Sequence, residues 1–457
     1  MVSWWLAQAG PLAPAQQLEG ARRADVCILG GGFTGLWTAL EIKRIEPSLD
    51  VVVVEAGLCG TGASGRNGGF AMTFWHHFTG LERACGAHEA VRLARASDAA
   101  VAGIGEFCDE HAIAAGYRRA GWFWTASNQA QVGAWENTLA AIERQGAKPF
   151  ERMNPDEIAA RTGSPTALAG VFEPGSATVQ PALLARGLLR VARTRGVQVF
   201  ECSPVVAIER AGRLTVRTAS GQITADRVVV AMGAWASQLR ELRRAFVIVS
   251  SDMVVTDPVA DLLRRTDLRD GTSISDSRLM VHYYRPTDDG RIAFGKGGGR
   301  LAYGARIPAT FSGPSPIASE VTRSMRATYP WLAPVPIAAS WTGPIDRTLD
   351  GLPFFCTLGR PDFVCGAGFS GNGVGPSALG GRILASMTLG SDDEWAHCGL
   401  VRKPPSGLPP EPFRYVGGGV VRGAVARKER AEDAGRRPDA IDVGLARLAP
   451  TGLVPVD

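Results

Sequence analysis

The segment from Asp25 to Ala56 constrains the fold of this chain most. A short apolar run, Val26 to Leu29, is followed by Gly30-Gly31-Gly32-Phe33-Thr34-Gly35 and a helix-patterned segment, and the apolar run Val51 to Val54 then ends in Glu55. Glycines that follow a strand, open a helix and are answered about twenty residues later by an acid are typical of the βαβ unit that binds dinucleotides. The sequence therefore predicts an α/β fold with a Rossmann-type domain.

The residue types of this first glycine loop, residues 30–35, suit a bound pyrophosphate. Gly30 permits a tight turn, Gly32 lets the backbone approach the phosphates, and Gly35 lets the helix pack closely on the strand. The helix N-terminus would present free N–H groups to the phosphates. Glu55 is placed to accept hydrogen bonds from ribose hydroxyls. We therefore expect an adenine dinucleotide to contact Gly30, Gly31, Gly32, Phe33, Thr34, Gly35, Glu55 and Ala56.

A second glycine-rich segment begins eight residues after Glu55. This second glycine loop, residues 63–69, reads Ala63-Ser64-Gly65-Arg66-Asn67-Gly68-Gly69 and can return the chain to the far half of an extended cofactor. An ordinary nicotinamide enzyme has no need of such a loop. Together the two loops resemble the D-amino-acid oxidase superfamily of FAD enzymes.

The resemblance covers about residues 20–390 and implies further FAD contacts. It places backbone at Val205 and Val206 against the adenine, and the segment that holds Gly233 and Trp235 over the adenosine side. A glycine turn, residues 368–374, would face the isoalloxazine ring through Phe369, Ser370, Gly371, Asn372, Gly373 and Val374. Relatives with covalent flavin carry a cysteine at the position of Trp341, or a histidine after the first loop, so noncovalent FAD is expected.

Length and motif spacing predict two domains. A chain of 457 residues exceeds what one hydrophobic core usually supports. The cofactor motifs are dispersed, which predicts a discontinuous FAD-binding domain of residues 1–84, 156–240 and 338–400. Residues 85–155 and 241–337 form the expected substrate domain, in which alternating stretches such as Arg278 to Tyr284 predict an antiparallel sheet. Residues 401–457 are expected to form a proline-rich linker and a surface helix.

Composition argues against several other classes of protein. The net charge of +5 is small for this length and gathers on no identifiable face, so nucleic acid is not expected as a partner. The eight cysteines and six histidines show no metal-ligand spacing, so no metal site is expected. No apolar run is long enough to span a bilayer and no export signal is recognisable, so a cytoplasmic location is expected.

The resemblance implies that the flavin performs the redox chemistry. The neutral substrate amine would lose hydride from its α-carbon to flavin N5, and the resulting imine would hydrolyse to an aldehyde. If the glycine turn opens a helix, its backbone N–H groups would hold the N1 to C2=O edge of the reduced flavin. Asn372 stands where many relatives have histidine, and it would add one neutral hydrogen bond there.

The segment Trp341 to Thr348 departs from the glycine oxidase branch of the family. In that branch the corresponding strand carries an arginine that binds the substrate α-carboxylate, and Ile345 takes this position here. Arg347 lies on the same strand face, and a small shift of the alignment would make it the clamp. Asp346 would meet either a cationic amine or a structural salt-bridge partner. The pattern favours amines over amino acids.

Three further groups of residues are candidates for the site. Tyr283 and Tyr284 lie on a predicted strand, so one should face the cavity and the other the core. Lys296 would either lie near the flavin, where its charge would speed the reaction with oxygen, or occupy a solvated turn. His76 and His77 would line the entrance or the flavin face. The candidate catalytic set is Asn372, Trp341, Tyr283, Lys296 and Asp346.

The leading hypothesis is an FAD-dependent oxidase of primary or secondary amines, most similar to the γ-glutamylputrescine oxidase branch, which passes electrons to oxygen and gives hydrogen peroxide. One alternative is an amino-acid oxidase of the glycine or sarcosine type. A second is a flavin dehydrogenase that passes electrons to a quinone or a carrier protein. The third, from another class, is a flavin-binding subunit without turnover. The expected partners are a small-molecule amine and an electron acceptor.

Overall fold

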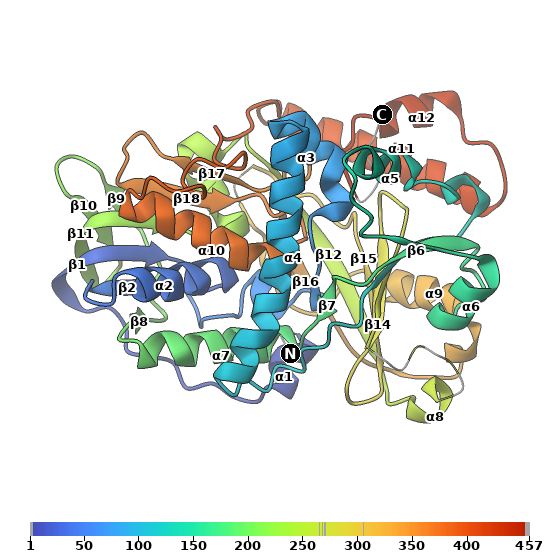
Figure 1. Cartoon of the computed structure of the whole chain (residues 1–457), viewed down its shortest axis with the longest axis horizontal. Coiled ribbons are helices and arrows are strands. Elements are labelled where there is room, and N and C mark those ends of the chain that lie inside the picture. Colours follow the sequence, from blue (N-terminus) through green and yellow to red (C-terminus); the bar gives the residue numbers. More distant parts are fainter. Residues whose placement is uncertain (1–2, 265, 267, 269–270, 305, 453–457) are drawn as a thin grey trace.

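The computed structural model describes residues 3–264, 266, 268, 271–304 and 306–452, and two large sheets lie side by side in it (Figure 1). The first sheet has the order β17 (Phe354–Thr357), β18 (Phe363–Ala367), β11 (Gly221–Val230), β1 (Gly20–Leu29), β2 (Val51–Val54) and β8 (Gln198–Phe200). In addition, β10 (Leu214–Arg217) pairs with β11, and β9 (Ala207–Glu209) pairs with β10. Strands β18, β11, β1, β2 and β8 are parallel. The predicted Rossmann-type architecture is thus confirmed.

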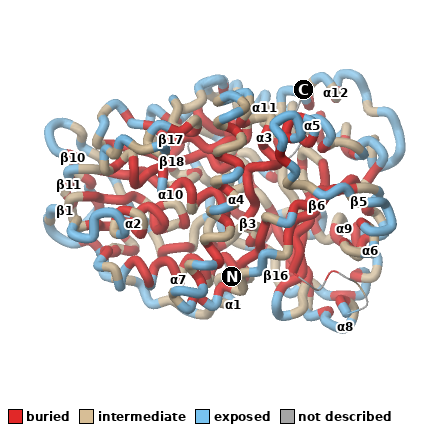
Figure 2. The backbone as a smooth tube through the Cα atoms, in the orientation of Figure 1, coloured by how far each residue is buried: buried red, intermediate tan, exposed pale blue. Residues whose placement is uncertain are grey.

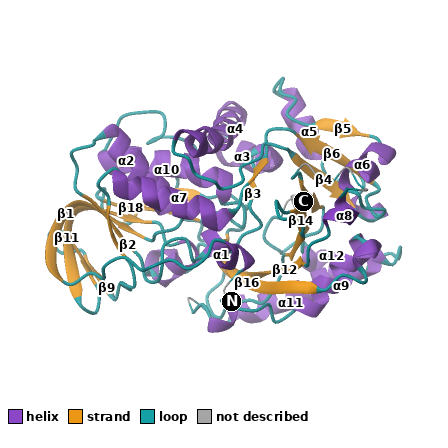
Figure 3. Cartoon of the chain, turned by 90° about the horizontal axis from the view of Figure 1, so that it is seen from below, coloured by secondary structure: helices purple, strands orange, loops and turns teal. Residues whose placement is uncertain are grey.

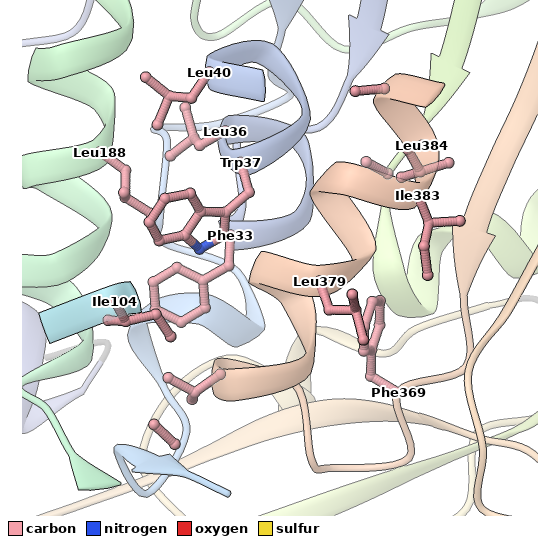
Figure 4. Packing of buried hydrophobic residues seen from close by; sticks show 14 of the residues in the cluster. Phe33, Leu36, Trp37, Leu40, Ile104, Leu188, Phe369, Leu379, Ile383 and Leu384 are labelled. Atoms are coloured by element: carbon pink, nitrogen blue, oxygen red, sulfur yellow. The ribbon is translucent and has the colours of Figure 1, made fainter. Parts of the chain in front are cut away.

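The parallel strands of the first sheet are apolar on both sides, so both faces must be covered. Helices cover one of these faces. These helices are α2 (Phe33–Ile45), α7 (Pro181–Thr194), α10 (Val374–Leu389) and α4 (Ala87–Glu110). These helices and the sheet share one cluster of buried apolar side chains, to which Leu36, Trp37 and Leu40 of α2 belong (Figure 4). A Cβ atom on Gly381 of α10 would lie 2.5 Å from the Cβ of Trp37, so the close crossing of α10 over α2 requires glycine there. Figure 2 shows that the central strands of this sheet are buried at their carboxyl ends, whereas the start of β1 is exposed.

The second sheet is mostly antiparallel, as expected, although β13 and β4 pair in parallel. Its order is β16 (Ile337–Arg347), β12 (Val247–Thr256), β15 (Ile292–Lys296), β14 (His282–Pro286), β13 (Ser273–Asp276), β4 (Trp122–Ala126), β6 (Ala169–Glu173) and β5 (Glu151–Met153). A buried cluster joins one face of this sheet to α9 (Ala318–Thr328) and α6 (Pro155–Thr162). The other face carries Trp341 and packs against α1 (Trp4–Gln8). Figure 3 shows α1 and β3 (Phe70–Ala71) between the two sheets.

Sheet membership does not follow the expected domain boundaries at two places. Strand β6 and strand β16 pair within the second sheet, whereas residues 156–240 and 338–400 were assigned to the FAD-binding domain. The division into domains therefore stays a proposal. Within residues 401–457, helices α11 (Phe413–Asp433) and α12 (Ala440–Ala446) form. Asn128 Nδ2 donates to Asp433 Oδ1 at 2.7 Å, which ties α11 to the second sheet.

The remaining helices are α3 (Phe78–Cys85), α5 (Glu136–Arg144) and α8 (Ala260–Leu263), and β3 pairs with β7 (Ala177–Thr178). All eight cysteines are free thiols. Among the described residues, no helix has both the length and the apolar character that crossing a membrane requires.

Candidate active site

The first glycine loop joins β1 to the uncapped N-terminus of α2. Gly30 has a φ of 109°, and a Cβ there would lie 2.5 Å from the carbonyl oxygen of Ala231. Gly32 is the N-cap of α2 and offers no side-chain hydrogen bond. A Cβ on Gly32 would lie 2.9 Å from Ser64 Oγ, which accepts a hydrogen bond from the Phe33 N–H at 2.9 Å. The two glycine loops therefore meet at the N-terminus of α2.

Glu55 ends β2 with its carboxylate held by backbone N–H groups. Oε2 accepts from Gly31 at 2.8 Å, and Oε1 accepts from Gly57 at 2.9 Å. Each oxygen keeps a further lone pair, which a ribose hydroxyl can use. The structure thus places Glu55 beside the first glycine loop, and ribose binding stays a prediction. Ala56 follows it at the protein surface.

Four consecutive carbonyl groups of the second glycine loop are bound by side chains from elsewhere. Ser3 Oγ donates to Gly65 at 2.7 Å, Trp341 Nε1 to Arg66 at 2.8 Å, Trp5 Nε1 to Asn67 at 2.8 Å, and Arg285 Nε to Gly68 at 3.0 Å. We refer to these four hydrogen bonds as the carbonyl clasp. It fixes the path of the loop between α1 and the second sheet. Trp341, a candidate catalytic residue, is fully buried and acts here as a donor to the backbone.

Side chains within the second glycine loop have different roles. Asn67 closes the loop on itself, since its Nδ2 donates to the Ser64 carbonyl at 2.8 Å and its Oδ1 accepts from the Gly69 N–H at 2.7 Å. Arg66 extends away from the loop and donates from Nη1 to Ser312 Oγ at 2.7 Å. Its buried Nε has no hydrogen-bond partner.

The adenosine side of the expected cofactor site is less closely defined. Trp235 lies beside the second glycine loop, because its Cζ3 would be 3.7 Å from a Cβ on Gly62. Gly233 begins this segment with a φ of 52°. Val205 packs against the buried cluster on the far face of the first sheet, and Val206 is exposed. Their contacts with an adenine stay a prediction.

The glycine turn connects β18 to the N-terminus of α10. Ser370 and Gly371 have φ values of 55° and 93°, and Gly373 caps α10 without a side-chain hydrogen bond. The glycine turn opens a helix, as the predicted role of its N–H groups requires, because α10 begins at Val374. Its first N–H groups and its dipole are therefore available to an electron-rich group. Phe369, at the base of the turn, packs into the core.

Asp346 serves the glycine turn. Its Oδ2 accepts from the Gly368 N–H at 2.6 Å, and its backbone carbonyl accepts from the Ser370 N–H at 3.2 Å. Burial raises the pKa of this carboxyl to about 6. Among the described residues Asp346 forms no salt bridge and its Oδ2 is bound by the backbone of the turn, while its contact with an amine stays a prediction.

Ile345 and Arg347 lie on the face of β16 that meets the glycine turn. Ile345 Cδ1 would be 3.3 Å from a Cβ on Gly371. Arg347 Nη2 is 3.4 Å from the Ser370 carbonyl oxygen, and its Nε has no partner. Burial lowers the pKa of this guanidinium. No carboxylate of the described residues forms an ion pair with it, so Arg347 is a buried cation that an anionic ligand would compensate.

Asn372 contacts two groups of the protein. Its Nδ2 lies 3.5 Å from the Thr73 carbonyl oxygen and 3.4 Å from His76 Nε2, while its buried Oδ1 has no partner. The free atom is therefore an acceptor, which cannot donate to the N1 to C2=O edge of a flavin. The Nδ2 group points toward the Thr73 carbonyl and His76, and a hydrogen bond from Asn372 to the flavin edge stays a prediction.

Two buried titratable groups adjoin the residues that contact Asn372: His76, which contacts it directly, and Glu173, which binds the Thr73 side chain. Burial holds the pKa of His76 well below its usual value, so the ring is neutral, and its Nδ1 has no partner. Glu173 accepts from Thr73 Oγ1 at 2.5 Å and from Ser176 Oγ at 2.9 Å. Burial raises the pKa of Glu173 to about 7. Sequence reasoning considered His76 but missed Glu173, which no motif marks.

The second sheet separates Tyr283 from Lys296. Tyr283 faces the second glycine loop, where a Cβ on Gly68 would lie 3.1 Å from its ring, and its hydroxyl is 2.8 Å from Ser251 Oγ. Lys296 pairs with His282 on the opposite face, and its Nζ lies 3.3 Å from His282 Nε2 and 3.7 Å from Glu320 of α9. The structure therefore does not bring Lys296 to the other candidates.

The donor set fits an extended flavin nucleotide. Two helices that pack on the first sheet, α2 and α10, begin at glycine N-caps, which have no side chain to bind the first N–H groups; in α2 Ser64 Oγ accepts from one of these, the Phe33 N–H. Buried polar atoms without a partner are uncommon in folded proteins. Such atoms occur around the second glycine loop and the glycine turn: Arg66 Nε, His76 Nδ1, Arg347 Nε and Asn372 Oδ1. FAD would be held by the first glycine loop, Glu55, the second glycine loop and the glycine turn.

Comparisons with known proteins agree with this fit. The model of the family described as FAD dependent oxidoreductase matches residues 25–387. The chain is 31% identical to gamma-glutamylputrescine oxidoreductase of Escherichia coli (strain K12), over 86% of this chain and 90% of that protein. It is also 31% identical to the probable oxidoreductase OrdL of Rhizobium meliloti (strain 1021), with coverages of 86% and 89%. The crystal structure of glycine oxidase from Geobacillus kaustophilus matches with a TM-score of 0.65 and 22% identity over 81% of this chain and 96% of that one, which shows a common fold.

Proposed function

Because this chain belongs to the family of FAD-dependent oxidoreductases, we propose that it oxidises the carbon next to the nitrogen of a primary or secondary amine. The substrate loses a hydride from this carbon and a proton from nitrogen, and the imine adds water to give an aldehyde and ammonia or a smaller amine. FAD, when bound, supplies the hydride acceptor, and oxygen, which becomes hydrogen peroxide, is the proposed final electron acceptor. The similarity to gamma-glutamylputrescine oxidoreductase supports an aliphatic amine substrate.

The single observation that carries this proposal is the position of Ile345. Its side chain lies against Gly371 of the glycine turn and presents methyl groups there. An apolar surface at this point cannot pair with the α-carboxylate of an amino acid, and burying an unpaired carboxylate is costly. An alkyl chain next to the reacting carbon would bury apolar area instead.

Asn372 and His76 suit the binding of the substrate amine group. Asn372 Oδ1 is a buried acceptor without a partner, so it suits an N–H donor of the substrate. His76 is neutral, because burial holds its pKa down, and it adds no positive charge that would oppose an amine. Asp346 shapes the glycine turn and takes no part in the chemistry.

A second candidate is an amino-acid oxidase of the glycine or sarcosine type. Arg347 favours it, since this buried guanidinium has an unpartnered Nε and no ion pair among the described residues. A substrate carboxylate would provide the missing charge. In this case Arg347, two residues beyond Ile345, takes the position of the clamp.

Flavin reduction without oxygen separates the two candidates. Purified holoenzyme is mixed anaerobically with aliphatic amines, including γ-glutamylputrescine, and with glycine, sarcosine and D-alanine, and flavin bleaching is followed. We expect the amines to bleach the flavin faster than the amino acids do. With the amines, Arg347→Met should bleach at the same rate as the unsubstituted protein. Faster bleaching by an amino acid that Arg347→Met abolishes would establish the second candidate. Admitting oxygen and measuring peroxide then distinguishes an oxidase from a dehydrogenase that uses a quinone or carrier.

A further inference from the structure

A cavity of about 230 Å³ lies outside the candidate active site. It is bounded by α1, the start of α7 and the end of β14, and no residue of the glycine turn lines it. Trp5 and Leu183 provide apolar walls, and Gln8, Gln180, Asp288 and Arg285 provide polar ones.

Arg285 is the buried charged group of this cavity, and Asp288 is an exposed charged group of its lining. The residue is 4% exposed, and its guanidinium lies 5.1 Å from the centre of the Trp5 ring. Nε donates to the Gly68 carbonyl at 3.0 Å, and Nη2 donates to the Val179 carbonyl at 2.6 Å. Nη1 donates to none of the described residues. Two neutral carbonyl groups thus hold the cation without neutralising it.

Neighbouring charges are already paired with each other. Asp288 Oδ1 lies 3.1 Å from Arg118 Nη2, and Asp289 Oδ2 lies 2.8 Å from Arg291 Nε. Arg285 forms no ion pair with a carboxylate of the described residues. Burial lowers the pKa of Arg285 to about 10, so the side chain remains protonated at neutral pH. A positive charge in such surroundings is stabilised by an anion.

We propose that this cavity binds a small aliphatic carboxylate, which accepts hydrogen bonds from Arg285 Nη1 and from the side-chain amide of Gln8. Gln8 Oε1 already accepts from Gln180 Nε2 at 3.1 Å, so its own Nε2 is free to donate. The short alkyl chain would lie against Leu183 and the Trp5 ring. The cavity shares Trp5 and Arg285 with the carbonyl clasp but has no residue of the glycine turn in its lining, and the proposal does not depend on the proposed function.

The test uses FAD-loaded protein without turnover. Binding of n-butyrate, butyramide and n-butylammonium is measured by calorimetry, because these probes share a carbon chain and differ in charge. We expect butyrate to bind, and the other two to bind at least about tenfold more weakly, since one charge-assisted hydrogen bond is worth a factor of this size. Arg285→Met should weaken butyrate binding by the same factor, whereas the control Arg213→Met, at an exposed arginine, should not.

A second variant, Gln8→Glu, gives a result even if Arg285→Met fails to fold. Gln8→Glu places a carboxylate at the wall of the cavity, where it would pair with Arg285 and exclude butyrate while FAD content stays unchanged. Equal binding of butyrate and butyramide would overturn the proposal, as would undiminished binding to Gln8→Glu. Butyrate that alters the flavin spectrum, or that an amine able to bleach the flavin displaces, would place the probe at the flavin site and also overturn it.

Discussion

Replacement of Trp5 by phenylalanine tests whether the carbonyl clasp holds the cofactor loop in its binding form. Trp5→Phe keeps an aromatic ring in the cluster with Trp341 and removes part of the ring volume together with the indole N–H that donates to Asn67 at 2.8 Å. A part-buried carbonyl left without a donor costs about 1–3 kcal/mol. If the loop must keep this path to bind FAD, the FAD dissociation constant rises by about 5- to 150-fold.

Trp4→Phe is the matched control, because Trp4 Nε1 is buried without a hydrogen-bond partner. The same substitution one residue earlier therefore removes no hydrogen bond, and FAD affinity should stay within about twofold of the unsubstituted protein. Apoprotein is titrated with FAD and the quenching of flavin fluorescence is followed, with melting temperatures measured in parallel. A Trp5→Phe protein that melts earlier but binds FAD with unchanged affinity would refute the coupling between clasp and cofactor.

Four further outcomes are expected. Gly32→Val should give folded protein without flavin, since even a Cβ there would lie 2.9 Å from Ser64 Oγ; normal flavin content would contradict the role of this loop. Acid precipitation should release FAD into the supernatant, because Trp341 stands where relatives with covalent flavin carry the cysteine that bonds to it. Colour in the pellet would show a covalent bond. Asn372→Ala should raise KM for the amine by about two- to twelvefold through loss of one neutral acceptor, with FAD retained, and an unchanged KM would mean that Oδ1 does not face the substrate. Burial raises the pKa of Glu173 from 4.5 to about 7, so the folded protein keeps a proton that the unfolded chain releases, and its contribution to the free energy of unfolding falls by about 3 kcal/mol as pH rises from 4.5 to 7. Glu173→Gln should abolish that fall in urea unfolding across this window, and an identical pH profile would refute the assignment.

Local sequence patterns were sufficient for the nucleotide-binding core. The first glycine loop, the apolar strands around it and the turn that opens α10 each depend on residues close in sequence, so glycine spacing and strand pattern predict them. The alternation of residues in β14 likewise separates Tyr283 from Tyr284. Such patterns place a residue on one of two faces without indicating which neighbour covers that face. For this reason the sequence left Lys296 open between a place near the flavin and a solvated turn, whereas it lies beside α9.

Long-range contacts explain the rest. Ser3 and Trp5 bind loop carbonyls 62 residues away, and no periodicity in the sequence marks such a hydrogen bond. The Asn372 amide lies against two groups, the Thr73 carbonyl and the His76 ring, that only the folded chain brings together. The residue type at position 372 was therefore informative about neutrality, whereas the direction of its donor was not.

The most direct test of the account is a single-turnover experiment on the purified, FAD-loaded enzyme. Under strict exclusion of oxygen, one equivalent of γ-glutamylputrescine is added, the flavin absorbance is followed, and the product is trapped with an aldehyde reagent. If the protein oxidises amines, we expect full bleaching of the flavin with one aldehyde formed for each flavin reduced. A flavin that stays oxidised with this and every other amine, yet bleaches with glycine or D-alanine, would contradict it.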